Sequence, residues 1–342
     1  MCPSPSPAPG RAPPHAPLAE ESLAEVLAEV RRIQAQARRL VREAMSGGYA
    51  SAFRGAGLAF ESVREYAEGD DPRAVDWNVT ARMGRPFVKT YVEERERTLL
   101  FLVDRSASMD GGTGLWSPRG AAARVLACLA LAAVRAGDRV GLCSFGAGST
   151  TWVAPGRGLA HALRLVRDVL ALPSEAGPAD PAPALDLATR LERRHGVVLL
   201  LSDLLGSPLG ASTGSAAGSA TGSTAASASA RCEAALRRCA RRHDTVAVHL
   251  QDPALAPPAV GLVRVHDPEG GPARLLDLGS PRVRAAHAAR VAAWRARLAA
   301  TLSRAHADLL ELPIPAAPRA DALSGPLQAF FRRREARRAA HR

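Results

Sequence analysis

Apolar runs alternate with amphipathic stretches along the chain from residue 98 onward. The runs at 99–103 and 196–203 are apolar up to their final positions, as is typical of strands buried on both faces of a sheet. Further strands are predicted at 138–146, 150–155 and 244–252, with a weaker pair at 262–267 and 273–278. Helical periodicity predicts helices at 119–136, 158–171, 182–194, 232–242 and 281–306. This alternation predicts an α/β fold, doubly wound around a mostly parallel, Rossmann-like sheet.

The segments outside that alternation suggest how the chain is divided. Residues 1–18 are rich in proline and are expected to be disordered. Residues 19–97 begin with an amphipathic helix and continue through a glycine-rich and then a polar segment, and 98–315 hold the α/β domain. Within that domain, the Gly/Ser/Ala/Thr segment 206–230 is predicted to be a flexible insertion. Residues 316–342 are predicted to form a basic C-terminal helix.

The charge of the chain is strongly positive, with a formal net charge of +12. Arginine supplies every basic side chain except Lys89, and aromatic residues make up only 4% of the sequence, so a base-stacking surface has few candidates. We therefore expect no specific nucleic-acid binding, and we interpret the arginine-rich end at 330–342 as a solvated helix face. A contact of that end with RNA or a membrane surface is the alternative.

The cysteines and the termini indicate where the protein works. The five cysteines show no CxxC or zinc spacing, and Cys128 and Cys143 lie in apolar runs, where a free thiol packs as a small hydrophobic group. The N-terminus lacks the apolar core of a signal peptide, and no uncharged apolar stretch reaches 18 residues. We predict a cytoplasmic protein with no transmembrane segment.

Oxygen-bearing side chains follow two of the predicted strands. Asp104 ends the strand at 99–103 and is followed by Ser106 and Ser108, and Asp203 ends the fourth strand. With strand order 3-2-1-4-5, these two strands flank the point where the order reverses, which is where open α/β sheets bind ligands. Oxygen ligands of this kind suit Mg²⁺ or Mn²⁺. The alternative for each serine is to cap the helix that follows.

Catalytic signatures are weak in this sequence. It holds no Walker A motif, and the stretch at 142–146 lacks the first glycine of GxSxG. His195, His243 and His249 lie near predicted strands, but their spacing places none of them in the crevice. We therefore expect a non-catalytic protein. A metal-dependent hydrolase that uses the same Asp/Ser cluster is the alternative.

The sequence from Asp104 to Ser108 resembles the DxSxS signature of von Willebrand factor type A domains, whose metal-ion-dependent adhesion site binds Mg²⁺. The resemblance implies the same role for Asp104, Ser106 and Ser108, and it matches Asp203 to the later metal-linked aspartate of those domains. The family's Gly-x-Thr-Asp loop has its counterpart at 177–180, where Ala179 replaces the threonine. A water molecule or Asp180 is a possible substitute for the missing hydroxyl; the site could also be vestigial.

The segment upstream of the first strand resembles the hallmark of the bacterial "domain of unknown function 58" family. The run GDDPRAVDW at 69–77 is followed by Ala-Arg at 81–82 and by Val-Lys at 88–89, and the resemblance extends from 46 to about 335. It implies that the chain acts as an adaptor of a MoxR-type AAA+ ATPase, in complexes thought to remodel or mature other proteins. The energy source would then lie in the partner, in agreement with the missing phosphate-binding loop.

That segment places charges of both signs next to a tryptophan. The charged residues are Asp70, Asp71, Arg73 and Asp76, and the tryptophan is Trp77. The structural interpretation is a charge-paired ledge packed over the edge of the sheet, with the tryptophan buried. The functional interpretation is an interaction surface, because Trp and Arg are frequent at binding hot spots.

Overall fold

The computed structural model describes residues 58–67, 70–71, 75–93, 97–210, 221–266, 273–319 and 322–340, and five helical positions at 28, 31, 32, 34 and 35. The proline-rich tail 1–18, most of the helix expected at its end, and Arg73 lie outside the described residues.

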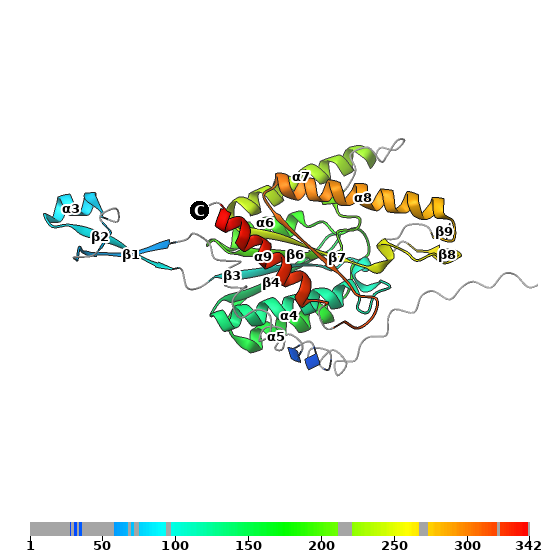
Figure 1. The fold of residues 1–342 in the computed structure, drawn as a ribbon, viewed down its shortest axis with the longest axis horizontal. Coiled ribbons are helices and arrows are strands. Elements are labelled where there is room, and N and C mark those ends of the chain that lie inside the picture. Colours follow the sequence, from blue (N-terminus) through cyan, green and yellow to red (C-terminus); the bar gives the residue numbers. More distant parts are fainter. Residues whose placement is uncertain are drawn as a thin grey trace, which may run out of the picture.

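A six-stranded sheet forms the centre of the molecule, and its strand order is β10-β7-β6-β3-β4-β5 (Figure 1). All neighbouring strands are parallel except β4 and β5, which are antiparallel. Counted along the chain, this is the order 3-2-1-4-5 that the interpretation of the site assumed, with a sixth strand added, and it confirms the doubly wound α/β fold. The strands are β3 (Thr98–Asp104), β4 (Arg139–Phe145), β5 (Thr150–Gly156), β6 (Val197–Ser202), β7 (Asp244–Gln251) and β10 (Asp308–Pro313).

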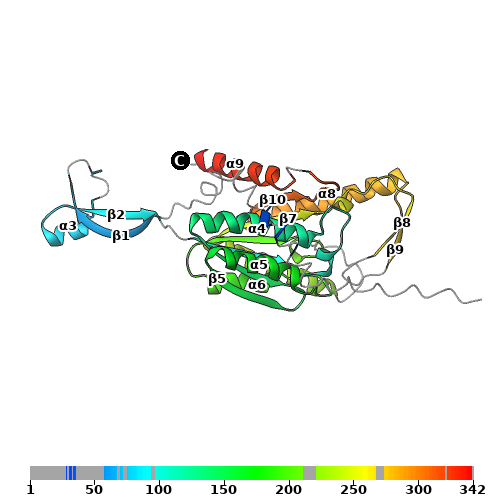
Figure 2. The ribbon, with the colours of Figure 1, turned by 90° about the horizontal axis from the view of Figure 1, so that it is seen from below.

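Helices cover both faces of the sheet (Figures 1 and 2). One buried apolar cluster joins the sheet to α4 (Pro118–Ala136), α5 (Gly158–Ala171) and α9 (Ser324–Ala340). The cluster on the other face joins it to α6 (Ala182–Leu191), α7 (Thr221–Arg242) and α8 (Pro281–Arg304). An antiparallel pair, β8 (Leu262–Val265) and β9 (Arg274–Asp277), precedes α8. The 3-10 turns among the described residues are η2 (Ala107–Asp110), η3 (Pro208–Gly210) and η4 (Pro253–Leu255).

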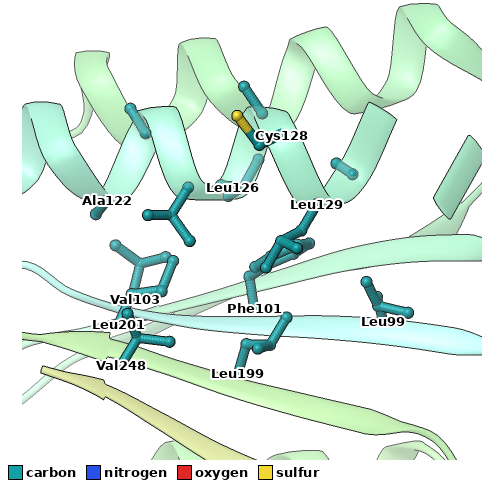
Figure 3. Close-up of a cluster of buried hydrophobic side chains, with 14 of the residues drawn as sticks. Leu99, Phe101, Val103, Ala122, Leu126, Cys128, Leu129, Leu199, Leu201 and Val248 are labelled. Atoms are coloured by element: carbon teal, nitrogen blue, oxygen red, sulfur yellow. The ribbon is translucent and has the colours of Figure 1, made fainter. Parts of the chain in front are cut away.

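The central strand β3 is apolar throughout because both of its faces are buried. Leu99, Phe101 and Val103 point toward α4, where they pack near Leu126 and Leu129 (Figure 3). The alternate residues of the strand, Leu100 and Leu102, belong to the cluster on the opposite face. Burying each such side chain contributes about 1.5–3 kcal/mol, so this strand anchors its last residue firmly.

The low-complexity segment 206–230 differs from the predicted flexible loop. Residues 221–230 form the first turns of α7, and Leu209 is buried within η3. Alanine favours helix strongly, and the segment continues a helix that Cys232 and Leu236 anchor in the core. The prediction of flexibility is therefore wrong for 208–210 and 221–230, and residues 211–220 lie outside the described part.

The basic C-terminal helix is present as α9 over 324–340, but it is more than a solvated face. Phe330, Phe331 and Arg334 are buried, and the Arg334 guanidinium pairs with Asp244 and Asp308. These contacts fix α9 against β7 and β10, so one of its arginines has a structural role. No helix in the described ranges combines the length and the apolar content needed to cross a membrane.

The family-specific segment forms an arm that stands apart from the α/β body (Figure 1). Its two antiparallel strands, β1 (Leu58–Glu65) and β2 (Phe87–Glu93), carry the short helix α3 (Trp77–Met83). Trp77 is 72% exposed, and α3 has no buried residue. The prediction of a ledge packed over the sheet with Trp77 buried is therefore wrong.

Candidate functional site

Asp104 ends β3 at the point where the strand order reverses, and both of its carboxylate oxygens accept hydrogen bonds. Oδ2 accepts from the hydroxyl of Ser202 at 2.5 Å, and Oδ1 accepts from the backbone N–H of Ser106 at 2.7 Å. Only 2% of Asp104 is exposed. The carboxylate thus links the ends of β3 and β6, the two strands that flank the reversal.

The two serines of the DxSxS sequence lie side by side next to this carboxylate. The hydroxyl oxygens of Ser106 and Ser108 are 3.0 Å apart, and both residues are buried. Ser106 occupies the N-cap position of η2, yet its side chain makes no capping hydrogen bond. The capping alternative therefore does not account for the Ser106 hydroxyl, which faces Ser108 instead.

Burial dominates the electrostatics of Asp104. Removal from water raises the pKa of the Asp104 carboxyl, while the hydrogen bonds from Ser202 and Ser106 and the positive charge of Arg119 act in the opposite direction. Arg119, at the start of α4, is itself buried and is paired with Asp110. A cation beside Asp104 would favour its ionised form, which burial disfavours.

Asp203 lies in a tight turn that the end of β6 holds in place. Its Oδ1 accepts from the N–H of Leu205 at 3.0 Å, and the Ser202 hydroxyl accepts from the N–H of Leu204 at 2.8 Å. Leu204 has a left-handed φ of 57°, a conformation that costs about 1–2 kcal/mol for a residue with a side chain. The two side-chain hydrogen bonds and the burial of Leu204 offset this cost, so the turn that carries Asp203 is fixed.

The loop that carries Ala179 and Asp180 reaches the same edge of the sheet, because the N–H of Asp180 donates to the carbonyl of Gly146 after β4. Ala179 is buried in the apolar cluster on the α6 side. One Asp180 oxygen accepts from the N–H of Ala182 at 2.9 Å, and the other pairs with Arg231 at 2.5 Å. Both oxygens of Asp180 therefore have partners that fix α6 and α7, which makes it a poor substitute for the missing threonine.

The site is bordered by an ion-pair cluster, which the sequence did not indicate. Arg105, which lies between Asp104 and Ser106 in the sequence, is buried and pairs with Glu175. Its guanidinium also donates to Ser149 and to the carbonyl of Pro173. The Ser149 hydrogen bond is the main influence that lowers the pKa of Glu175. The backbones meet as well, since the Glu175 N–H donates to the carbonyl of Arg105. This cluster holds the loop before α6 against the end of β3.

The matching family model is described as "Protein of unknown function DUF58", and it covers residues 62–297. The chain belongs to the DUF58 family. Relatives include Uncharacterized protein Rv1480 of Mycobacterium tuberculosis and Uncharacterized protein Mb1516 of Mycobacterium bovis. Each is 29% identical over 291 residues, which cover 84% of this chain and 84% of the relative. The family resemblance inferred from the sequence is thereby confirmed.

Solved structures show a more distant likeness to this DUF58 protein. The SpRpn10 VWA domain aligns with a TM-score of 0.34 and 13% identity, over 68% of this chain and 93% of the other. The pilus adhesin SpaC from Lactobacillus rhamnosus GG aligns with a TM-score of 0.40 and 14% identity, over 71% of this chain and 30% of the other. These scores are too low to transfer any property of those proteins.

The donor set of the site fits a hard cation in part. Asp104, Ser106 and Ser108 offer oxygen atoms from one short segment, and Asp203 lies in the turn directly after the neighbouring strand β6. Such oxygens match the preferences of Mg²⁺ and Mn²⁺. In the described part of the chain, no group of three or more His, Cys, Asp or Glu side chains could hold a metal ion. A cation here would therefore depend on the serine hydroxyls.

One histidine lies closer to this edge than the sequence indicated. His249 on β7 is the register partner of Ser202 on β6. Its ring is fully buried and lies edge-on to Trp294 of α8. Burial, with the charge of Arg295, lowers the pKa of His249 to about 4. The ring of His249 is therefore part of the packed interior between β7 and α8.

The residues expected to form an interaction surface are distributed over the arm. Asp70 pairs with Arg64 at 2.6 Å, and this hydrogen-bonded partner holds the pKa of Asp70 below its usual range. Asp76 caps α3 by accepting from two backbone N–H groups, and Asp71 and Trp77 are exposed.

The arm and the Asp104 site lie at opposite ends of the same strand. The arm precedes β3, whereas Asp104 is the last residue of that seven-residue strand. At about 3.3 Å per residue, the strand separates the two by roughly 20 Å. They are therefore two separate candidate surfaces.

Proposed function

We propose that this DUF58 protein is a non-catalytic interaction module that captures a partner at the edge of the sheet where Asp104 lies. The observation that carries this proposal is the gathering of the Asp104, Ser106 and Ser108 oxygens at the switch point of the sheet. Open α/β sheets bind their ligands at this position. Because the sequence holds no Walker A motif and no histidine of the described residues is exposed at this edge, we assign the protein recognition instead of chemistry.

The ligand we propose for this edge is Mg²⁺ or Mn²⁺, held by Asp104, Ser106, Ser108 and Asp203. When bound, the ion supplies a positive centre to which an Asp or Glu side chain of a partner can bind. The chain's own residues orient the serine hydroxyls and exclude water around Asp104. The buried ion pair of Arg105 and Glu175 keeps the adjoining loop in place while the partner binds.

The partner we propose is a MoxR-type AAA+ ATPase, with this protein as its cytoplasmic adaptor in protein maturation or remodelling. Membership of the DUF58 family and the absence of a Walker A motif support this assignment. The arm provides a second contact surface, since Trp77 is an exposed aromatic side chain on a projecting element. Aromatic residues of this kind often dominate the binding energy of an interface.

Calorimetry tests the metal site directly. We expect Mn²⁺ to bind the wild type, and we expect binding to be lost in the double variant Ser106→Ala/Ser108→Ala. The control is Ser144→Ala, because Ser144 is a buried serine on β4 whose hydroxyl has no hydrogen-bond partner among the described residues. Equal Mn²⁺ binding by all three proteins would contradict the assignment.

A pull-down with a MoxR-type ATPase from the same organism tests the partner. Removing the metal with a chelator would also disable the ATPase, so the comparison uses the double serine variant at constant Mg²⁺. We expect less ATPase to be retained by the double serine variant and by Trp77→Ala than by Ser144→Ala. Full retention by both test variants would exclude the two surfaces as the points of contact.

A further inference from the structure

Strand β10 forms one edge of the six-stranded sheet and pairs only with β7. No other described strand lies along its outer side. On an edge strand, alternate N–H and C=O groups point away from the sheet and can pair with an added strand. Natural proteins protect such edges by keeping them short or by placing proline there, and β10 ends at Pro313 after six residues.

A cavity of about 740 Å³ opens at the first residues of this edge. The end of α8, the start of β10 and the face of α9 line it, and Figure 2 shows α9 on the β10 side of the body, away from β5. Among its apolar lining residues, Leu309 is partly exposed and Ala336 is exposed, while Leu302 and Phe330 are buried behind them. His306, with a left-handed φ of 59°, turns the chain from α8 into β10. The space is therefore bounded by two helices and the open edge of a strand.

The rim of this groove is basic. Arg333 and Arg337 of α9 line it together with Asp308 of β10. Asp308 is already shared between Arg337 and the buried Arg334, at 3.0 and 3.1 Å. Arg333 is exposed and has no carboxylate partner in the described part of the chain. The groove thus offers an unpaired positive charge beside an apolar wall and an edge strand.

We propose that this groove binds an extended acidic peptide of a partner protein, which adds to the sheet as a strand alongside β10. The backbone of the peptide would pair with the outward N–H and C=O groups of β10. Its side chains would then point alternately toward α9 and toward α8. Asp or Glu on the α9 side would meet Arg333, and the alternate, apolar residues on the α8 side would contact Leu309. Polyanions such as RNA and anionic membranes share the charge preference but offer no backbone to pair with the strand.

This site is separate from the proposed metal edge. Asp308 begins β10, and the parallel strand β7 begins on the same side, whereas Asp104 ends β3. The two sites therefore lie at opposite ends of the parallel strands. Failure of the peptide site leaves the metal site untouched, and the reverse also holds.

Selection from a display library of random octapeptides on the full-length protein tests the proposal. We expect enrichment of sequences that alternate Asp or Glu with β-branched or aromatic residues. We expect the affinity of an enriched peptide to fall about fivefold for Arg333→Glu, because reversing one exposed charge replaces a weak attraction by a weak repulsion. The control is Arg332→Glu, an exposed arginine of α9 that does not line the groove. The two variants should have the same thermal midpoint as the wild type.

A proline scan of the enriched peptide reports how it binds. Pairing along one edge predicts that proline disrupts binding at every second central position and is tolerated at those between. Disruption at all central positions would indicate a helical peptide and would overturn the proposal. An absence of acidic enrichment, an equal effect of the two arginine variants, or displacement of the peptide by a single-stranded RNA 20-mer or phosphatidylglycerol vesicles would overturn it as well.

Discussion

The hydroxyl of Ser202 donates a 2.5 Å hydrogen bond to Oδ2 of Asp104, so the last residues of β6 and β3 are joined at the switch point. The same hydroxyl accepts from the N–H of Leu204, which is held in a left-handed conformation. Ser202 therefore couples the carboxylate at the centre of the proposed site to the turn that carries Asp203. Asp104 and Leu204 are both buried, so water cannot replace either of these hydrogen bonds.

Replacing Ser202 by alanine should destabilise the protein by about 1–3 kcal/mol. The change leaves one Asp104 oxygen without this donor and the Leu204 N–H without this acceptor, and a buried polar group that loses its partner costs about that much. Urea unfolding gives the free energy directly. Ser144→Ala is the control, since the buried Ser144 hydroxyl has no partner to lose in the described residues. Equal stabilities of the two variants would show that the Ser202 contacts are not maintained in solution.

The sheet and its central helix could be predicted because their sequences are consistent at every level. The run 99–103 is apolar at each position, and α4 begins at Ser117-Pro118 and ends at Gly137, which has a left-handed φ of 84°. Strand β10 was missed because Asp308 and Glu311 interrupt its short apolar pattern. Their charges are accommodated by contacts with α9 and β7, which are distant in the sequence.

The site was predictable only where its residues are close in sequence. Asp104, Ser106 and Ser108 belong to one motif, and the structure brings them together. Glu175 meets Arg105 across 70 positions, so no local pattern indicates the pair. The structural interpretation of residues 69–77 placed Trp77 in a charge-paired ledge packed over the sheet. Only the arrangement of the arm shows that α3 lies away from the α/β body and has no buried residue.

The pair of Arg105 and Glu175 should contribute more to stability than the pairs on the surface. Glu175→Gln would leave the Arg105 guanidinium, only 8% exposed, without its counter-charge, and we expect a loss of about 2–3 kcal/mol. Glu65→Gln is the matched control, because Glu65 and its partner Arg85 are 60% and 74% exposed, and exposed pairs contribute little. Urea unfolding of both variants checks the difference. A similar small effect for both would show that water reaches the Arg105 pair.

Acid should destabilise the folded protein through two buried histidines. Burial, followed by the charge of Arg242, lowers the pKa of His243 to about 4, and His249 is shifted equally. The unfolded chain then binds more protons than the folded one between pH 6.5 and 4. The contribution of the two neutral histidines to the free energy of unfolding is fully present above pH 6.5. It is lost as the pH falls through this window, by up to about 3 kcal/mol for each histidine.

The slope of the unfolding free energy against pH measures this effect. His249→Gln removes one titrating group, so the slope between pH 6.5 and 4 should be shallower than in the wild type, whatever the change in absolute stability. Glutamine keeps a neutral polar group beside Gln251, the present partner of the ring. An unchanged slope would mean that His249 is protonated in the folded state.

Trp77→Ala should leave the stability of the protein unchanged within about 0.5 kcal/mol while it weakens partner binding. The side chain is 72% exposed, so its removal leaves no cavity and exposes little apolar surface. Val88→Ala provides the contrast within the same arm, because Val88 is 5% exposed and its truncation should destabilise the arm. Thermal unfolding together with retention of the MoxR-type ATPase separates the two effects. An equal fall of the thermal midpoint in Trp77→Ala and Val88→Ala would mean that the tryptophan is packed in solution. Its role would then be to stabilise the arm and not to bind a partner.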